Sequence, residues 1–294
     1  MRLAILLLVI PFAVTRAQVP PPGDSAALAS FVARARAGTE ALRSPEAARA
    51  AGYRPVGPDF PGMGRHWIHT ALILRSTPDP AQPPVLEYAE LNGTTALVGV
   101  AYAVLVKGDT VPTSLPVPAA AWHFHQGTVE EESFLRAHAG VASHVMTTAE
   151  GPGGPGGPGG PGGPGGPGGP RLAVVHAWIW LDNPDGVWAT DNWALPYARL
   201  GLAVPQHTSH AAARALALAA GDGGRSYLEA LLHAVGQPSD DEMKALAIVV
   251  ARHQMEARAH TANVTELEWC WRALWEDIKG NVRPDVWERL EALR

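Results

Sequence analysis

Residues 151–170 repeat glycine and proline with a strict period of three. Glycine has no side chain and proline has no backbone N–H, so this stretch supplies neither core side chains nor regular ladder hydrogen bonds. The glycine period is that of collagen, but a single short block of this composition is more typical of a flexible, solvated insertion. We interpret it as an expanded loop without chemistry of its own. The fold must then be built from the segments on either side.

Those segments are sufficient for a sizeable core, because 47% of the 294 residues are hydrophobic and 17% are charged. The length predicts about two domains. The net charge is −5 and there is no long basic run, so we expect no nucleic-acid partner. The only cysteine, Cys270, cannot form a disulfide within the chain.

Residues 1–17 have the pattern of a secretory signal peptide, with Arg2 before an apolar run and small residues at Thr15 and Ala17. The apolar run is shorter than the ~20 residues needed to span a membrane. We therefore predict a secreted or periplasmic protein without a stable membrane anchor after cleavage.

The remaining chain is predicted to be α+β, with three parts. Residues 18–59 form an N-terminal helical segment, in which Ser44 and Pro45 are typical of a helix start. Residues 60–206 form a β domain with the insertion inside it, and Asn92-Gly93 predicts a hairpin between strands 85–91 and 95–106. Residues 207–294 form a helical domain, where Ser239 and Glu242 fit a capping box. We expect an antiparallel β core, a small barrel or a sandwich, followed by this helical part.

A predicted strand at residues 121–127 carries two histidines on one face. His123 and His125 lie about 7 Å apart at roughly 3.3 Å per residue, and Trp122 and Phe124 point to the opposite face. Paired imidazoles on a rigid element are typical ligands of a divalent transition metal such as Zn, Fe, Cu or Ni.

Two further histidines extend this candidate site. His176 lies in the strand-like segment 172–181, and His66 follows the glycines of Gly62-Met63-Gly64. His66 and His69 face opposite ways on a strand, so at most one can join, and we favour His66. The predicted metal ligands are His66, His123, His125 and His176, with Glu130 as a further ligand or a proton-transfer group.

Other histidines offer alternatives. His253 and His260 lie in the apolar stripe of a long predicted helix, with Glu256 between them, and could form a site in a bundle core. Such histidines more often bond to backbone or carboxylates. His207 and His210 fit a solvated loop. Trp178, Trp180, Trp188 and Trp193 could line a pocket or pack in the core.

Three segments together resemble a family of uncharacterised secreted bacterial proteins: residues 62–66 (GMGRH), residues 97–102 (LVGVAY), and residues 176–186 with HAWIW and NPDG. The likeness covers roughly residues 60–200 and implies a shared fold. Members often carry Glu where this chain has Ala101, so no carboxylate role is implied there. His123-Phe124-His125 followed by Glu130 is also similar to the first motif of cupins, which implies a small β-barrel with an open metal site.

These patterns support three hypotheses. The first is a secreted metal-dependent oxygenase or hydrolase acting on a small molecule. The second is a non-enzymatic extracytoplasmic protein that binds a metal or a small ligand. The third is a structural module in which the histidines only satisfy hydrogen bonds.

Overall fold

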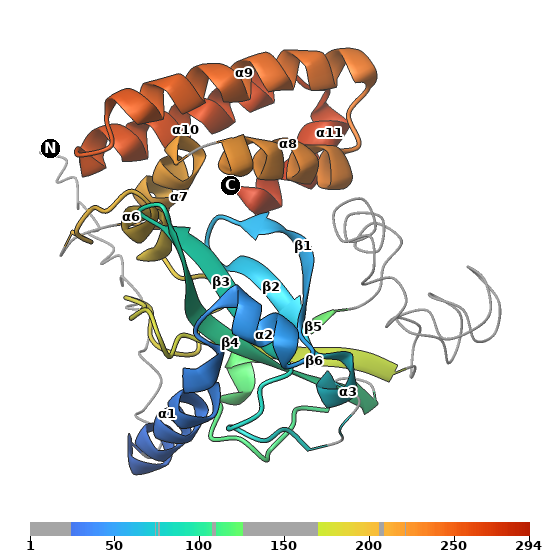
Figure 1. The fold of residues 1–294 in the computed structure, drawn as a ribbon. Coiled ribbons are helices and arrows are strands. Elements are labelled where there is room, and N and C mark those ends of the chain that lie inside the picture. The colour runs from blue at the N-terminus through green and yellow to red at the C-terminus, as the bar shows by residue number, and fades with distance from the viewer. Residues whose placement is uncertain are drawn as a thin grey trace, which may run out of the picture.

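The structure, a computed structural model, describes residues 25–73, 75, 77–107, 110–125, 170–205, 209–220 and 222–294. The described strands form one antiparallel sheet of six strands in the order β1-β2-β3-β4-β6-β5 (Figure 1). Their bounds are β1 Arg54–Phe60, β2 Gly64–Ile68, β3 Val85–Leu91, β4 Thr94–Lys107, β5 His123–His125 and β6 Pro170–Ala177. Among these strands β1 and β5 are edges that do not pair with each other. The sheet is therefore open and layered with helices, and does not close into a barrel.

The β3–β4 hairpin begins where the sequence predicts it. Asn92 (φ 47°) and Gly93 (φ 81°) both adopt the left-handed backbone that this two-residue turn requires. The β3–β4 register shifts after Glu87, where the pairing moves from Glu87↔Gly99 to Tyr88↔Leu97. This bulge leaves Glu87 directly opposite a residue without a side chain.

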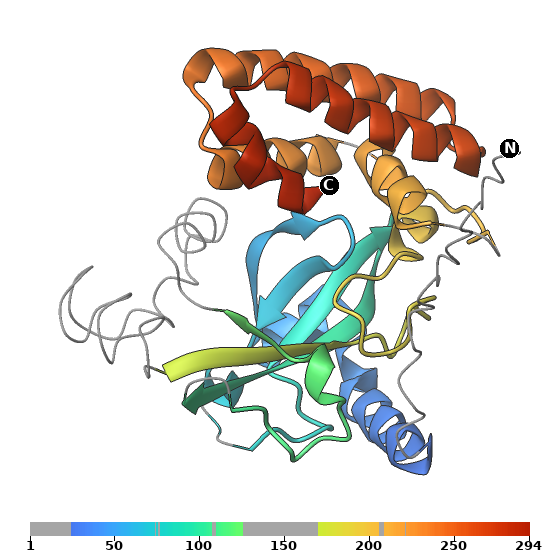
Figure 2. The ribbon, with the colours of Figure 1, turned by 180° about the vertical axis from the view of Figure 1, so that it is seen from behind.

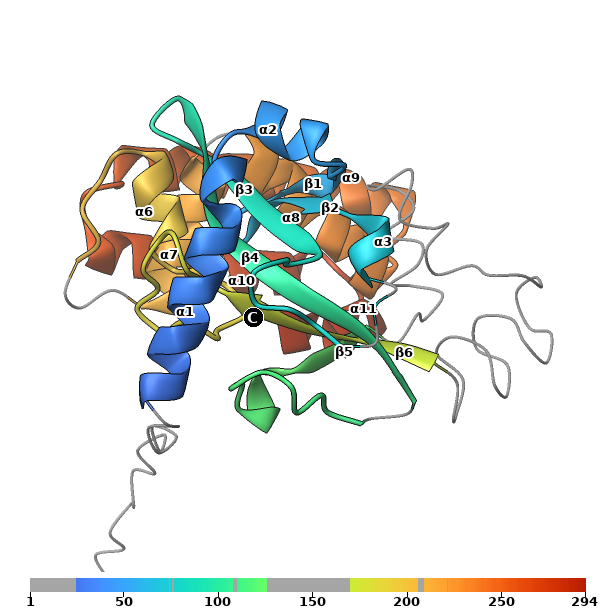
Figure 3. The same ribbon diagram turned by 60° about the horizontal axis from the view of Figure 1, so that its bottom comes forward.

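One face of the sheet packs against the N-terminal helices α1 (Ser25–Thr39), η1 (Glu40–Leu42) and α2 (Pro45–Ala50), and α1 lies across the sheet in Figure 3. Phe31 and Ala35 of α1 join a buried cluster with Leu86, Tyr102 and Trp122. The Ser44 side chain accepts a hydrogen bond from the Ala47 backbone, as predicted for the start of α2. The first strand begins at Arg54, within the segment predicted to be helical.

The C-terminal part is helical, which confirms the predicted α+β class. Figure 2 shows α8–α11 as a layer above one end of the sheet. The helices are α6 Leu195–Arg199, α7 His210–Ala219, α8 Asp222–Gly236, α9 Asp240–Ala259, α10 Val264–Gly280 and α11 Pro284–Leu290, followed by η3 Glu291–Leu293. Their apolar faces share a separate buried cluster that includes Leu216, Leu246, Leu274 and Trp275. The predicted capping box at Ser239 and Glu242 is formed.

Two short elements, α3 (Thr70–Ile73) and η2 (Ala119–Ala121), lie in the connections between strands. None of the described helices has the length and apolar character needed to cross a membrane. The predicted signal peptide at residues 1–17 lies outside the described residues, and so does the insertion up to residue 169.

Candidate metal centre

The candidate site lies on the sheet face that is turned away from α1. Strand register decides which side chains share this face, because alternate residues point to opposite sides. His66 of β2 pairs with Glu87 of β3, Glu87 pairs with Gly99 of β4, and His176 of β6 pairs with Ala101 of β4. Gly99 and Ala101 are two residues apart and so share one face. The register therefore lines up His66, Glu87 and His176 across four adjacent strands.

The three side chains converge on one point. Nδ1 of His176 contacts Oε1 of Glu87, and Nε2 of His66 lies 3.6 Å from the same oxygen. The candidate ligand atoms of all three residues lie within 4.8 Å of one another. The rings of His66 and His176 have centroids 5.8 Å apart.

Small residues on β4 make this convergence possible. Glu87 and His176 sit on strands separated by β4, whose spacing puts their backbones about 10 Å apart. A Cβ at Gly99 would lie 2.3 Å from Oε2 of Glu87 and 3.0 Å from the Trp178 ring. Ala101 is also small and is 1% exposed. The Glu87 side chain therefore crosses β4 in the space that a larger residue at position 99 would fill.

The site is buried apart from one edge. Glu87 is fully buried and His176 is 3% exposed, whereas the His66 side chain is 22% exposed. Among the described residues, no hydrogen-bond partner reaches Oε2 of Glu87 or Nε2 of His66. Buried polar atoms of this kind are costly unless something satisfies them. An unsatisfied carboxylate oxygen beside an unsatisfied imidazole nitrogen is the pattern expected of a site that binds a cation.

Electrostatics keeps the carboxylate ionised. Burial by itself would raise the pKa of Glu87, but attraction to His176, the contact of Nδ1 of His176 with Oε1 and attraction to the nearby His66 together outweigh burial and lower the pKa below its usual value. An ionised carboxylate and neutral imidazoles are the protonation states in which these groups bind metal. His66, Glu87 and His176 could therefore hold a metal ion.

Of the other predicted ligands, His123, His125 and Glu130, only His123 has a described side chain. The ring of His123 stacks on that of His176, with centroids 5.2 Å apart and planes at 6°. His123 pairs with Val174 and lies beside the cluster without belonging to it. The backbone of His125 pairs with Leu172, four residues from His176 along β6, or roughly 13 Å at the usual rise. Its side chain and Glu130 lie outside what the structure describes.

Glu87 is the ligand candidate that the sequence did not single out. It stands between Leu86 and Tyr88 in the buried part of β3, where a carboxylate is rarely found without a partner. The outcome for His69 agrees with the prediction: it follows the end of β2 and packs edge-on against Tyr53, away from the cluster.

The rival histidine pair on the long helix does not converge. His253 is buried between two carboxylates, with Nε2 2.7 Å from Asp277 and Nδ1 2.8 Å from Glu256. His260 is exposed at the end of α9. This is the carboxylate-bonded arrangement expected of most helix histidines. His210 is exposed and lies 2.7 Å from Asp185, and His207 lies outside the described residues.

The four tryptophans do not line one pocket. Trp178 lies next to the site, with its ring 6.5 Å from that of His176 and its Nε1 donating to the Ala189 carbonyl. Trp180 and Trp188 pack in the core beneath α1, and Trp193 packs in the helical core.

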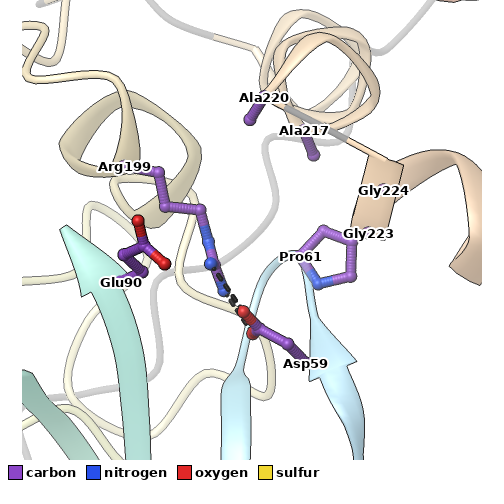
Figure 4. Close-up of a pocket in the computed structure, with 8 residues that line it drawn as sticks. All are labelled: Asp59, Pro61, Glu90, Arg199, Ala217, Ala220, Gly223 and Gly224. Atoms are coloured by element: carbon purple, nitrogen blue, oxygen red, sulfur yellow. Dashed lines mark hydrogen bonds and ion pairs between the residues drawn. The ribbon is translucent and has the colours of Figure 1, made fainter. Parts of the chain in front are cut away.

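A pocket of about 210 Å³ lies between the sheet end and the helices α7 and α8 (Figure 4). Arg199 reaches into it between Asp59 and Glu90, and both terminal nitrogens of Arg199 donate to the Asp59 carboxylate. No histidine lines this pocket. The Arg199–Asp59 ion pair links α6 to β1. None of the three candidate metal ligands lines this pocket.

No family model, curated protein or solved structure matches the chain. The likeness to the secreted bacterial family and to cupins therefore stays a prediction.

Proposed function

We propose that the chain is a secreted metal-dependent enzyme whose ion is bound by His66, Glu87 and His176. The observation that carries this proposal is the convergence of the three ligand atoms within 4.8 Å, from three strands, around a fully buried carboxylate. Groups far apart in the sequence meet here in a buried part of the sheet. An ion would satisfy Oε2 of Glu87 and Nε2 of His66, which have no hydrogen-bond partner among the described residues.

The donor set favours a divalent transition metal. Two histidines and one carboxylate with open positions are the ligands of many non-haem iron(II) oxygenases, and two histidines with glutamate also hold zinc in hydrolases. Cu and Ni are bound by the same imidazole donors. The reaction class is thus an oxygenase if the ion is iron and a hydrolase if it is zinc.

The three ligands found among the described residues leave coordination positions for water and a substrate. Structural zinc sites instead use four protein ligands. This difference supports an enzyme over the alternative, a non-enzymatic extracytoplasmic protein that binds a metal or a small ligand. His66 is the most exposed of the three residues, so a small molecule would approach the ion from its side.

A structural role for the three residues predicts different behaviour. A buried ion pair between Glu87 and protonated His176 would need no metal, and replacing such pairs is often neutral or stabilising. The binding proposal requires both residues for metal content, whether or not folding depends on them.

The test is elemental analysis of protein expressed and purified without a histidine tag. We expect one equivalent of a single transition metal in the wild type and in the control His260→Ala, which removes an exposed histidine. Glu87→Gln keeps the side-chain shape but removes the charge, and His176→Ala removes a donor, so both should lose the metal. Folded variants that keep a full equivalent would overturn the proposal.

A substrate screen separates the enzyme from the binding protein. We expect the metal-loaded wild type to turn over a member of a panel of small esters, amides or oxidisable substrates. The Glu87→Gln variant should not. Stoichiometric metal without turnover would favour the non-enzymatic alternative.

A further inference from the structure

The ring of His176 stacks against two other flat rings. The centroid of the His123 ring is 5.2 Å away with its plane at 6°, and that of the Trp178 ring is 6.5 Å away with its plane at 13°. We propose that His123 and Trp178 are positioning residues, whose rings hold His176 in the plane from which it binds the ion. The inference rests on the proposed function, because it needs an ion at His66, Glu87 and His176.

Strand register puts the two flanking rings on opposite sides of His176. His123 of β5 pairs with Val174 of β6, which lies two residues before His176 and therefore on the same face. Trp178 comes two residues after His176. Its ring lies 3.0 Å from where a Cβ of Gly99 would stand, on the side of the sheet that carries the site. The His176 ring is therefore stacked between the other two.

Both flanking rings are fixed by contacts outside the ligand set. His123 stands between Trp122 and Phe124, which pack in the core beneath α1 on the opposite face. All three residues of β5 pair with β6, so this short strand has a defined register. Trp178 is 3% exposed, and its Nε1 donates to the Ala189 carbonyl at 2.6 Å. The two outer rings thus form the rigid support that a functional group needs around it.

The His176 ring depends on this support for its orientation. The torsion that turns a histidine ring has broad minima, so the side chain by itself does not fix the plane of the ring. Metal-binding histidines usually donate their second ring N–H to a carboxylate or a carbonyl outside the ligand set. Among the described residues, the only hydrogen bond to the His176 ring comes from Glu87, which is itself a candidate ligand. Stacking is the contact that ties the ring to residues beyond the ligands.

Both distances are those of favourable ring pairs. Aromatic rings attract one another with centroids about 4.5–7 Å apart, most often in offset stacks or edge-to-face pairs. Rotation of the His176 ring would break the stack on both sides at once and carry its nitrogens away from the ion. The role differs from that of a fourth ligand, which the sequence suggested for His123, because it depends on the flat ring and not on a ring nitrogen.

The experiment measures the Co²⁺ affinity of the full chain by competition with a chelator and records the visible spectrum of the bound cobalt. We expect His123→Ala to weaken binding about 10–100-fold, as for other changes in residues that orient a ligand, and to alter the spectrum. His123→Leu, which fills the space without a flat ring, should bind as weakly. His123→Phe keeps a flat ring and should restore the wild-type affinity and spectrum. The affinity should also be higher in Trp178→Phe than in Trp178→Leu.

The matched control is His69→Ala. It removes a histidine ring that packs at the same centroid distance of 5.2 Å, but against Tyr53 instead of against a ligand. This variant should bind cobalt as the wild type does. Denaturant unfolding of the metal-free proteins shows that each variant is folded, and it separates a loss of stability from a loss of affinity.

Wild-type affinity in folded His123→Ala or His123→Leu would overturn the inference for His123. An equal loss in His123→Phe would also overturn it, because a ring nitrogen would then be required and His123 would be a ligand. Equal affinities in the two Trp178 variants would overturn the role of Trp178. Failure of the wild type to bind cobalt would contradict the metal centre itself, and the positioning role with it. The cobalt content of the wild type thus separates the two failures.

Discussion

Gly99→Ala tests the contact between Glu87 and His176 most directly, because it adds a methyl group where the Glu87 carboxylate lies. The new methyl carbon would stand 2.3 Å from Oε2 of Glu87, and 3.0 and 3.2 Å from two carbons of the Trp178 ring. Carbon–oxygen contacts shorter than about 3.3 Å are repulsive. The carboxylate must therefore move by about 1 Å, which breaks its alignment with His176.

The stability change expected for Gly99→Ala is the difference between two opposing contributions. Overpacking a buried site costs about 1–3 kcal/mol. Alanine offsets about 0.5–1 kcal/mol of this, because it loses less backbone freedom than glycine on folding. We expect the free energy of unfolding to fall by about 1–2 kcal/mol, and metal affinity to fall about 10–100-fold, as for changes that misplace a ligand.

Denaturant unfolding and a competitive chelator titration measure these two quantities. In a Glu87→Ala background the clash with Oε2 is absent and only the tight approach to the Trp178 ring remains. The same Gly99→Ala change should then cost less than in the wild type, and the double-mutant cycle should show coupling between positions 87 and 99. Gly223→Ala is the control, because its Cβ would meet nothing within 4 Å. Wild-type stability and metal affinity in Gly99→Ala would refute the claim that Glu87 crosses β4 at this position.

The other predictions concern the scaffold and the pH response. Ser239→Ala removes the α9 cap and should lower the free energy of unfolding by about 1 kcal/mol in urea, whereas an unchanged midpoint would show that the cap is dispensable. Burial raises the pKa of Asp191 in the folded state, so the stabilising contribution of its neutral carboxyl group is complete below the unfolded pKa of about 4 and is lost as pH rises through the folded pKa. Asp191→Asn should therefore gain stability relative to the wild type as pH rises above about 4. A constant difference between the two proteins across a pH series of urea midpoints would contradict this. Deleting residues 151–170 should leave soluble yield and metal content intact, and loss of soluble protein would show that the insertion takes part in folding.

The sequence predicted most of the elements because their signals are local. The Asn92-Gly93 turn, the Ser44 and Ser239 caps and the alternation around Trp122 depend on residues within a few positions of one another, and each is formed. The β1 strand was missed because its sequence, with Pro55, Gly57 and Pro58, carries weak strand signals. It is defined by pairing with β2, which no local pattern reveals.

The candidate site was predicted only in part, because it depends on strand order as well as on local sequence patterns. Histidines on strands were recognised, and His66 and His176 do meet, but the sequence does not state which strands are neighbours. The order β3-β4-β6 puts Glu87 within reach of His176 only because Gly99 lies between them. The regular register of the Asn92-Gly93 hairpin would put Val98 opposite Glu87, and no local pattern predicts the bulge that brings Gly99 there instead. The only sequence signal for Glu87 is therefore a carboxylate between apolar strand residues.

The most direct test is anomalous diffraction from crystals of the metal-loaded protein, recorded on both sides of the metal's absorption edge. We expect one strong anomalous peak bound by a ring nitrogen of His66, a Glu87 carboxylate oxygen and a ring nitrogen of His176, at about 2.0–2.2 Å from each. A peak elsewhere in the chain, or full metal content with no peak between β2, β3 and β6, would contradict it.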